Sequence, residues 1–186
     1  DNEISYNEAA TTAGTMDYAA LGGGISMFFD ISGSFSNNDI SNNSIDAPGT
    51  YRSWGAGVFI EDISSDDFVF ENNLVQQNYI SNTQNCRGGG LSLIIAGGKY
   101  LNNVIRNNSA ACGGGISIYN AGNYNDTVVL INNTITGNTA TYGGGIFTAM
   151  SNVVVINSII TENNSFLYPS IRLESGILKV RYSDVS

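Results

Sequence analysis

Histidine is absent from this chain of 186 residues, and cysteine, proline and tryptophan number two, two and one. The missing imidazole removes the commonest general base and the commonest transition-metal ligand, and it excludes Ser-His-Asp and Cys-His catalysis. Basic residues are also few, since seven Lys and Arg stand against sixteen Asp and Glu, for a net charge of −9. With no basic run, the chain offers nothing that would attract nucleic acid. No apolar run approaches the ~18 residues of a membrane helix, so no membrane insertion by this segment is expected.

Glycine and asparagine, by contrast, recur in two motifs. Glycine-rich triplets, each followed by Ile, Val or Leu, lie at 22–24, 55–57, 88–90, 113–115 and 143–145. Between them stands a second motif, which has an apolar residue, a spacer, two asparagines, a spacer, a β-branched residue and, three residues on, a third asparagine. Its copies begin at Phe35, Phe70, Tyr100, Leu130 and Val155, and the last copy has Ser158 as the second residue of the pair. A period of roughly 25–35 residues is typical of a solenoid.

Short apolar runs, broken by Asn and Gly, indicate strands rather than helices. Examples are the runs 68–70, 128–131 and 153–156, which are too short for the 3.6-residue periodicity of a helix. Each period holds one strand after the glycines, one before the asparagine pair and one carrying Ile40, Val75, Ile105, Ile135 or Ile160. We therefore predict an all-β, right-handed parallel β-helix of about six coils with three short strands each. It forms a single domain over residues 1–186.

The asparagines are predicted to be structural. Asn tolerates the left-handed conformation of tight bends, and its amide can bond to an identical amide in the coil above and the coil below. One predicted ladder contains Asn38, Asn73, Asn103 and Asn133, with Ser158 at its end. The second contains Asn43, Asn78, Asn108, Asn138 and Asn163. Of the Asn-x-Ser/Thr sequences, Asn125 lies in a predicted loop and is the best candidate for glycosylation.

The alternation of Gly-Gly-(Ala/Gly)-(Ile/Leu/Val) with Phe-x-x-Asn resembles the repeats of polymorphic outer-membrane-protein and autotransporter-type surface adhesins. These adhesins belong to the pectate-lyase-like β-helix superfamily. Residues 35–38 and 70–73 match the Phe-x-x-Asn form, and 180–185 resembles the last strand of secreted bacterial β-helix proteins. The resemblance implies an extracellular or cell-surface location. It implies little about activity, because this fold hosts enzymes, adhesins and structural fibres alike.

Both ends of the sequence fall inside the repeat. Ile4 to Asn7 matches the second half of the asparagine motif, so the chain enters in the middle of a coil. We expect further coils, or neighbouring copies placed end to end, as partners, and filament formation is one expected property.

Specific binding is expected in the loops before the early glycine triplets, where aromatic rings would stack on the sugars of an extracellular polysaccharide. The alternative is that these side chains merely cover the early coils. The candidates for a glycan-binding site are Tyr18, Tyr51, Arg52, Trp54, Tyr79 and Arg87.

The sequence also suggests a calcium site and a disulfide. The carboxylates of Glu61, Asp62, Asp66 and Asp67 supply oxygen ligands for Ca²⁺, the one cofactor considered, or form only a solvated acidic loop. Cys86 and Cys112 precede consecutive glycine triplets, where stacked positions lie about 5 Å apart, and we predict a disulfide between them. Their one-residue offset in the repeat works against it.

Catalysis is the less favoured function. The outward row after the glycines contains no Lys and no carboxylate pair, whereas polysaccharide lyases and hydrolases need such groups. That row reads Ser26, Phe59, Ser92, Ser117, Phe147 and Arg172. We therefore expect an extracellular structural or adhesive β-helix segment with no catalytic residues. The alternatives are a glycan-binding module or part of a polysaccharide-degrading enzyme of the same superfamily.

Overall fold

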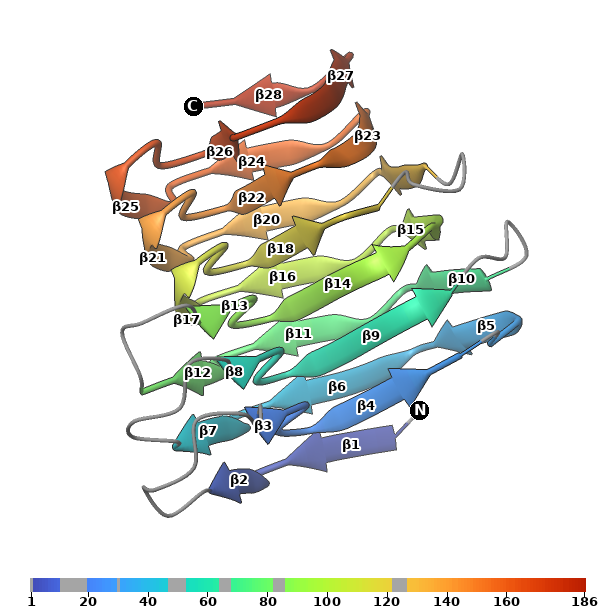
Figure 1. The fold of residues 1–186 in the computed structure, drawn as a ribbon, viewed down its shortest axis with the longest axis vertical. Coiled ribbons are helices and arrows are strands. Elements are labelled where there is room, and N and C mark those ends of the chain that lie inside the picture. The colour runs from blue at the N-terminus through green and yellow to red at the C-terminus, as the bar shows by residue number, and fades with distance from the viewer. Residues whose placement is uncertain are drawn as a thin grey trace.

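A computed structural model describes residues 2–10, 20–29, 31–46, 53–63, 68–81, 86–121 and 127–186, with backbone only for Ile63 and Cys86. Throughout these ranges the regular structure consists of strands, which stack coil on coil from the N-terminus to the C-terminus (Figure 1). The strands pair in parallel within four sheets, so the predicted right-handed parallel β-helix is confirmed. Within the same ranges there is no helix of the length and apolarity that a membrane span requires.

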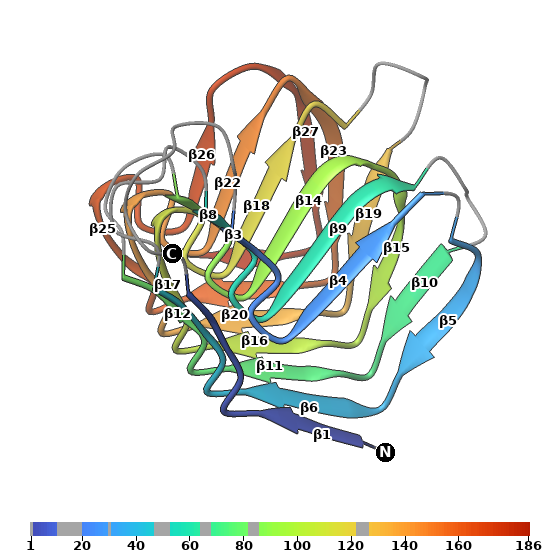
Figure 2. The ribbon, with the colours of Figure 1, turned by 60° about the horizontal axis from the view of Figure 1, so that its bottom comes forward.

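Three of the sheets, which we call A, C and D, correspond to the three predicted strands of each period. They form a triangle around the main core (Figure 2). Sheet A consists of β1 (Asn2–Ser5), β6 (Asn38–Ser41), β11 (Leu74–Gln76), β16 (Val104–Arg106), β20 (Thr134–Thr136), β24 (Ile159–Thr161) and β28 (Asp184–Val185). Sheet C, after the glycines, consists of β4 (Ile25–Phe28), β9 (Val58–Ile63), β14 (Leu91–Ala96), β18 (Ile116–Tyr119), β22 (Ile146–Ala149) and β26 (Ile171–Leu173). Sheet D, before the asparagine pairs, consists of β5 (Gly33–Ser36), β10 (Phe68–Glu71), β15 (Gly98–Leu101), β19 (Val128–Ile131), β23 (Ser151–Ile156) and β27 (Gly176–Arg181).

A fourth sheet, B, follows the third asparagine of each motif and is not predicted by the sequence. Its strands are β2 (Glu8–Ala10), β7 (Ser44–Asp46), β12 (Tyr79–Ile80), β17 (Ser109–Cys112), β21 (Thr139–Tyr142) and β25 (Asn164–Leu167), with β3 (Ala20–Leu21), β8 (Ser53–Trp54) and β13 (Cys86–Arg87) as a second row. The continuous strand β17 pairs with both β12 and β13, so the early coils contain the same strand split in two. Sheet B forms a lobe beside the triangle (Figure 2).

The core consists of apolar columns that are kept in register by the parallel pairing. Ile40, Val75, Ile105, Ile135 and Ile160 occupy one column of sheet A and are all fully buried. Beside it, Phe35, Phe70 and Tyr100 stack in a column of sheet D, with ring centroids 5.5 and 6.0 Å apart. A smaller apolar cluster, which includes Ile45, Ile80 and Ala110, lies along sheet B. Because each coil repeats the same inward residues, every coil buries its apolar face against the next.

Both predicted asparagine ladders are present. In the second, the backbone N–H and the Nδ2 of Asn78 donate to Oδ1 of Asn108 at 3.0 Å, and Asn108 donates likewise to Asn138. In the first ladder, the N–H of Asn133 donates to Oγ of Ser158, as predicted. The ladder does not end there, because the N–H of Ser158 donates to Oγ of Ser183. These side chains are buried, so the bonds satisfy polar groups that no water reaches.

The two asparagines of each pair have different roles, a division that the sequence does not show. The first takes the left-handed conformation, as at Asn72 (φ 55°) and Asn102 (φ 56°), and the second forms the ladder. The residue before the third asparagine is also left-handed, and this position is occupied by Asn42, Gln77, Asn107, Gly137 and Glu162 in successive coils. The conformation turns the side chains of Asn42, Gln77, Asn107 and Glu162 outward at the corner between sheets A and B.

Glycine is required at the bends into sheet C because neighbouring coils touch there. A Cβ on Gly90 would lie 2.6 Å from the carbonyl oxygen of Gly115 in the next coil. The backbone bonds also continue through the bend, where the N–H of Gly90 donates to Gly114 at 3.1 Å. The last coil makes the same bend without glycine, with Tyr168 at φ 64° in the place of Gly143.

Candidate functional site: an aromatic and arginine face

The outer face of sheet C carries the row that the sequence predicts, and the register aligns all six residues. Phe59, Ser92, Ser117 and Phe147 point away from the core yet are almost completely buried. Among the described residues, the hydroxyls of Ser92 and Ser117 have no hydrogen-bond partner. Side chains from the lobe must therefore lie over this row.

The covering side chains include two of the predicted glycan-binding residues. Trp54 and Arg87 are adjacent in the register of sheet B. The indole of Trp54 stacks on Phe59, with ring centroids 6.0 Å apart and planes inclined by 25°. The guanidinium carbon of Arg87 lies 4.1 Å from the ring centroid of Tyr119 and 5.5 Å from that of Phe147. The structure thus places Trp54 and Arg87 on one surface, where they cover Phe59 and Phe147, and glycan binding by them stays a prediction.

A second arginine extends this surface toward the C-terminus. The guanidinium carbon of Arg172 lies 4.5 Å from the ring centroid of Tyr142, 5.8 Å from that of Phe147 and 5.7 Å from that of Tyr168. Its ion pair with the half-exposed Glu174 is long, at 3.8 Å. Both guanidinium groups therefore flank Phe147, held mainly by cation–π contacts. We call the surface made by Trp54, Phe59, Arg87, Tyr119, Tyr142, Phe147 and Arg172 the aromatic–arginine face.

The charges of this face are only partly neutralised. Within the described part of the chain, Nη1 of Arg87 is buried and has no hydrogen-bond partner. Arg87 and Arg172 are only half-buried as whole residues, so their guanidinium N–H groups other than Nη1 of Arg87 supply hydrogen-bond donors. The face therefore offers aromatic surface together with hydrogen-bond donors.

Cys112 lies in the same sheet B row as Arg87, and its thiol has no disulfide partner among the described side chains. Burial raises the pKa of this thiol, while the guanidinium groups of Arg87 and Arg172 act in the opposite direction. The register pairs Cys112 with Arg87 instead of Cys86, which is the offset that the repeat implies. The side chain of Cys86 lies outside the described residues, so the disulfide remains a prediction.

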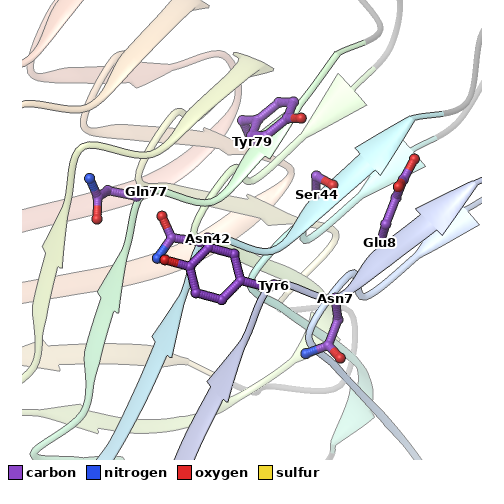
Figure 3. A pocket seen from close by; sticks show the side chains of 7 residues that line it. All are labelled: Tyr6, Asn7, Glu8, Asn42, Ser44, Gln77 and Tyr79. Atoms are coloured by element: carbon purple, nitrogen blue, oxygen red, sulfur yellow. The ribbon is translucent and has the colours of Figure 1, made fainter.

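Tyr79, the third described candidate, lies on a different surface from Trp54 and Arg87. It lines a hollow of about 350 Å³ at the corner between sheets A and B, opposite Tyr6 and beside Asn42 and Ser44 (Figure 3). The other candidates, Tyr18, Tyr51 and Arg52, fall outside the described residues, as does the glycosylation candidate Asn125.

The acidic group proposed for Ca²⁺ is only half described. Glu61 lies on the outer face of sheet C, and its pKa is raised above the ordinary 4.5 by burial and by the nearby Asp62 carboxylate. Asp66 and Asp67 are outside the described ranges, within which no cluster of three or more metal-ligating side chains occurs. Calcium binding thus remains a prediction.

Sequence reasoning misses part of the site. Tyr119, Tyr142 and Arg172 belong to the aromatic–arginine face, although they lie outside the early loops to which the predicted glycan site is confined. Alignment of the repeats could have identified Tyr142, because it occupies the position of Arg87 two coils later.

Comparison with known proteins adds no relative to this picture. No family model matches the chain, and no curated protein or solved structure matches it.

Proposed function

We propose that this chain is an extracellular, adhesive β-helix segment of the bacterial surface-protein type and that it binds carbohydrate through the aromatic–arginine face. The observation that carries the proposal is the band of rings from Trp54 to Tyr168, with Arg87 and Arg172 packed on the rings of its C-terminal part. Sugars present an apolar C–H face to an aromatic ring and a polar edge to hydrogen-bond donors, and this band supplies both.

Binding without hydrolysis fits the band better than catalysis does. A glycosidase needs two carboxyl groups within about 10 Å of each other across the scissile bond. On the described outer face of sheet C, Glu61 and its neighbour Asp62 lie together in β9, whereas Glu174 lies just after β26. The three strands β14, β18 and β22 lie between β9 and β26, so Glu174 is about 19 Å along the stack from the two acids of β9.

The test is glycan-array binding of the purified chain and of its Trp54→Ala variant. We expect the variant to lose about tenfold or more in affinity, because a central aromatic anchor carries a large share of binding energy. Tyr182→Ala is the matched control, since Tyr182 is 88% exposed at the far end of the chain. Binding by the wild type that Trp54→Ala leaves unchanged, in a variant with native circular dichroism, would refute the role of this face.

A second candidate function is structural, namely end-to-end assembly of copies of this chain. The last coil of this polypeptide exposes residues of the core columns, among them Leu173, Val180 and Val185, each 40–44% exposed. The ladders are also directional, because amide groups donate from each coil to the oxygen of the next. The two ends of the stack are therefore complementary, with acceptors at one end and donors at the other, and a second copy can continue the same ladder.

A further inference from the structure

A second binding surface lies outside the aromatic–arginine face, in the hollow at the corner between sheets A and B. Its position is set by two columns. Tyr6, Asn42 and Gln77 occupy the left-handed corner in the first three coils. Glu8, Ser44 and Tyr79 are aligned in neighbouring strands of sheet B. Because Tyr6 and Tyr79 belong to the first and third coils, they are separated by two strand spacings, or about 10 Å.

The two tyrosines stand on opposite sides of a short polar floor formed by Asn42 and Ser44 (Figure 3). Tyr6 is 78% exposed and Tyr79 is 49% exposed, so neither ring is buried in the core. This is unlike Phe59 and Phe147 of the aromatic–arginine face, which are buried.

Several polar side chains of the hollow make no side-chain hydrogen bond to other described residues. Among the described residues, no side-chain hydrogen bond engages the amides of Asn42 and Gln77 or the carboxylate of Glu8. The amide of Asn7, in contrast, is fixed in the ladder, where its Nδ2 donates to Asn43 at 2.9 Å. The hollow thus has a rigid wall and several free donors and acceptors.

The aromatic character of the hollow is confined to the early coils. The later residues at the corner are Asn107, Gly137 and Glu162, and those aligned with Tyr79 are Ser109, Thr139 and Asn164. The rings are therefore a local departure from the repeat, and the fold does not need them.

From these observations we infer that the hollow between Tyr6 and Tyr79 is a subsite for one neutral pyranose unit of a glycan. The sugar ring lies on the Asn42 and Ser44 floor, and its C–H face packs against a tyrosine ring. Its hydroxyls donate to the Glu8 carboxylate and bond to the amides of Asn42 and Gln77. This site is separate from the aromatic–arginine face and does not depend on it.

Saturation-transfer difference NMR on the whole chain tests the inference, with the methyl pyranosides of glucose, galactose and mannose and with N-acetylglucosamine as probes. We expect a saturable signal from at least one probe and a loss of about tenfold or more in affinity for Tyr6→Ala with Tyr79→Ala. Glu8→Gln is expected to weaken binding severalfold, because an amide replaces a charged acceptor. Tyr182→Ala is the control for loss of an exposed tyrosine.

Trp54→Ala separates this inference from the proposed function. It is expected to leave pyranoside binding within twofold of the wild type, whereas it is expected to weaken array binding to the aromatic–arginine face by about tenfold or more. The inference fails if no probe gives a saturable signal, or if the double tyrosine variant, natively folded by circular dichroism, binds within twofold of the wild type.

Discussion

At the scale of single residues, neighbouring asparagines are chemically alike and structurally unlike. Asn107 is exposed in a left-handed bend, whereas Asn108 is buried and bonded on every side. The Nδ2 of Asn108 donates to the carbonyl of Val75 and to Oδ1 of Asn138, both at 3.0 Å, and its Oδ1 accepts from Asn78. The distinction shows why a repeat of identical residues does not predict equal sensitivity to mutation.

Asn108→Asp tests this distinction with almost no change of shape. A carboxylate oxygen would face two acceptors in a site without water, so we expect a loss of about 3 kcal/mol in the free energy of unfolding at pH 7. Burial raises the pKa of the new carboxyl group, so the native state binds the extra proton and part of the loss is recovered as the pH falls. Urea denaturation at pH 7 and pH 4 measures both effects.

Asn107→Asp is the matched control, since the same substitution is made one residue earlier on the surface. Asp tolerates the left-handed conformation, so the change in stability is expected to stay within about 0.5 kcal/mol. Equal losses in the two variants would contradict the assignment of the ladder as the stabilising element.

At the scale of elements, the bends into sheet C are limited by space more than by backbone conformation. Gly90 is not in the left-handed region, yet a Cβ there would lie 2.6 Å from the Gly115 carbonyl oxygen and 3.1 Å from Cγ2 of Ile105. Backbone and core atoms cannot move aside without separating two coils.

Gly90→Ala is accordingly expected to destabilise the chain by about 3 kcal/mol, since it overpacks a bend that has no room. Gly33 provides the comparison, because it has a φ of +97° but a Cβ added there would meet nothing within 4 Å. Gly33→Ala should cost only the conformational penalty of about 1–2 kcal/mol. Thermal or urea denaturation of the two variants ranks the effects, and a smaller loss for Gly90→Ala would rule out close coil contact as its cause.

At the scale of the whole molecule, the last coil of this polypeptide leaves one side of its core columns uncovered. Val180 belongs to a core column, where it pairs with Val155, but it is 42% exposed in the last coil. Exposed ends of this kind are where β-solenoids associate, because unpaired strands and apolar side chains lie together.

We therefore expect a polypeptide of residues 1–186 to form end-to-end oligomers or ordered fibres as its concentration rises, as measured by sedimentation velocity and electron microscopy. Val180→Lys places a charge within the contact and should keep the chain monomeric. Tyr182→Lys adds the same charge on the exposed outside and should not. A wild type that sediments as a monomer at every concentration would count against end-to-end assembly.

The period, the parallel β-helix, the core columns and both asparagine ladders can all be predicted from the sequence. These features are local and are repeated in every coil, so the residues that face inward or bond to the next coil can be recognised from spacing alone. Sheet B escaped prediction because its strands are short and weakly apolar, and in the early coils they are split into β2 with β3, β7 with β8, and β12 with β13.

Which outward residues lie together depends on the three-dimensional fold. Trp54 contacts Phe59, and Tyr142 contacts Arg172, although the members of each pair come from different sheets. These contacts form because the lobe of sheet B lies beside the outer face of sheet C. The same lobe separates Tyr79 from Trp54, although the sequence placed them in one group. The physical reason is that a repeat encodes contacts between equivalent positions, whereas the direction of an outward side chain depends on the bend angles and on the lengths of the segments between strands.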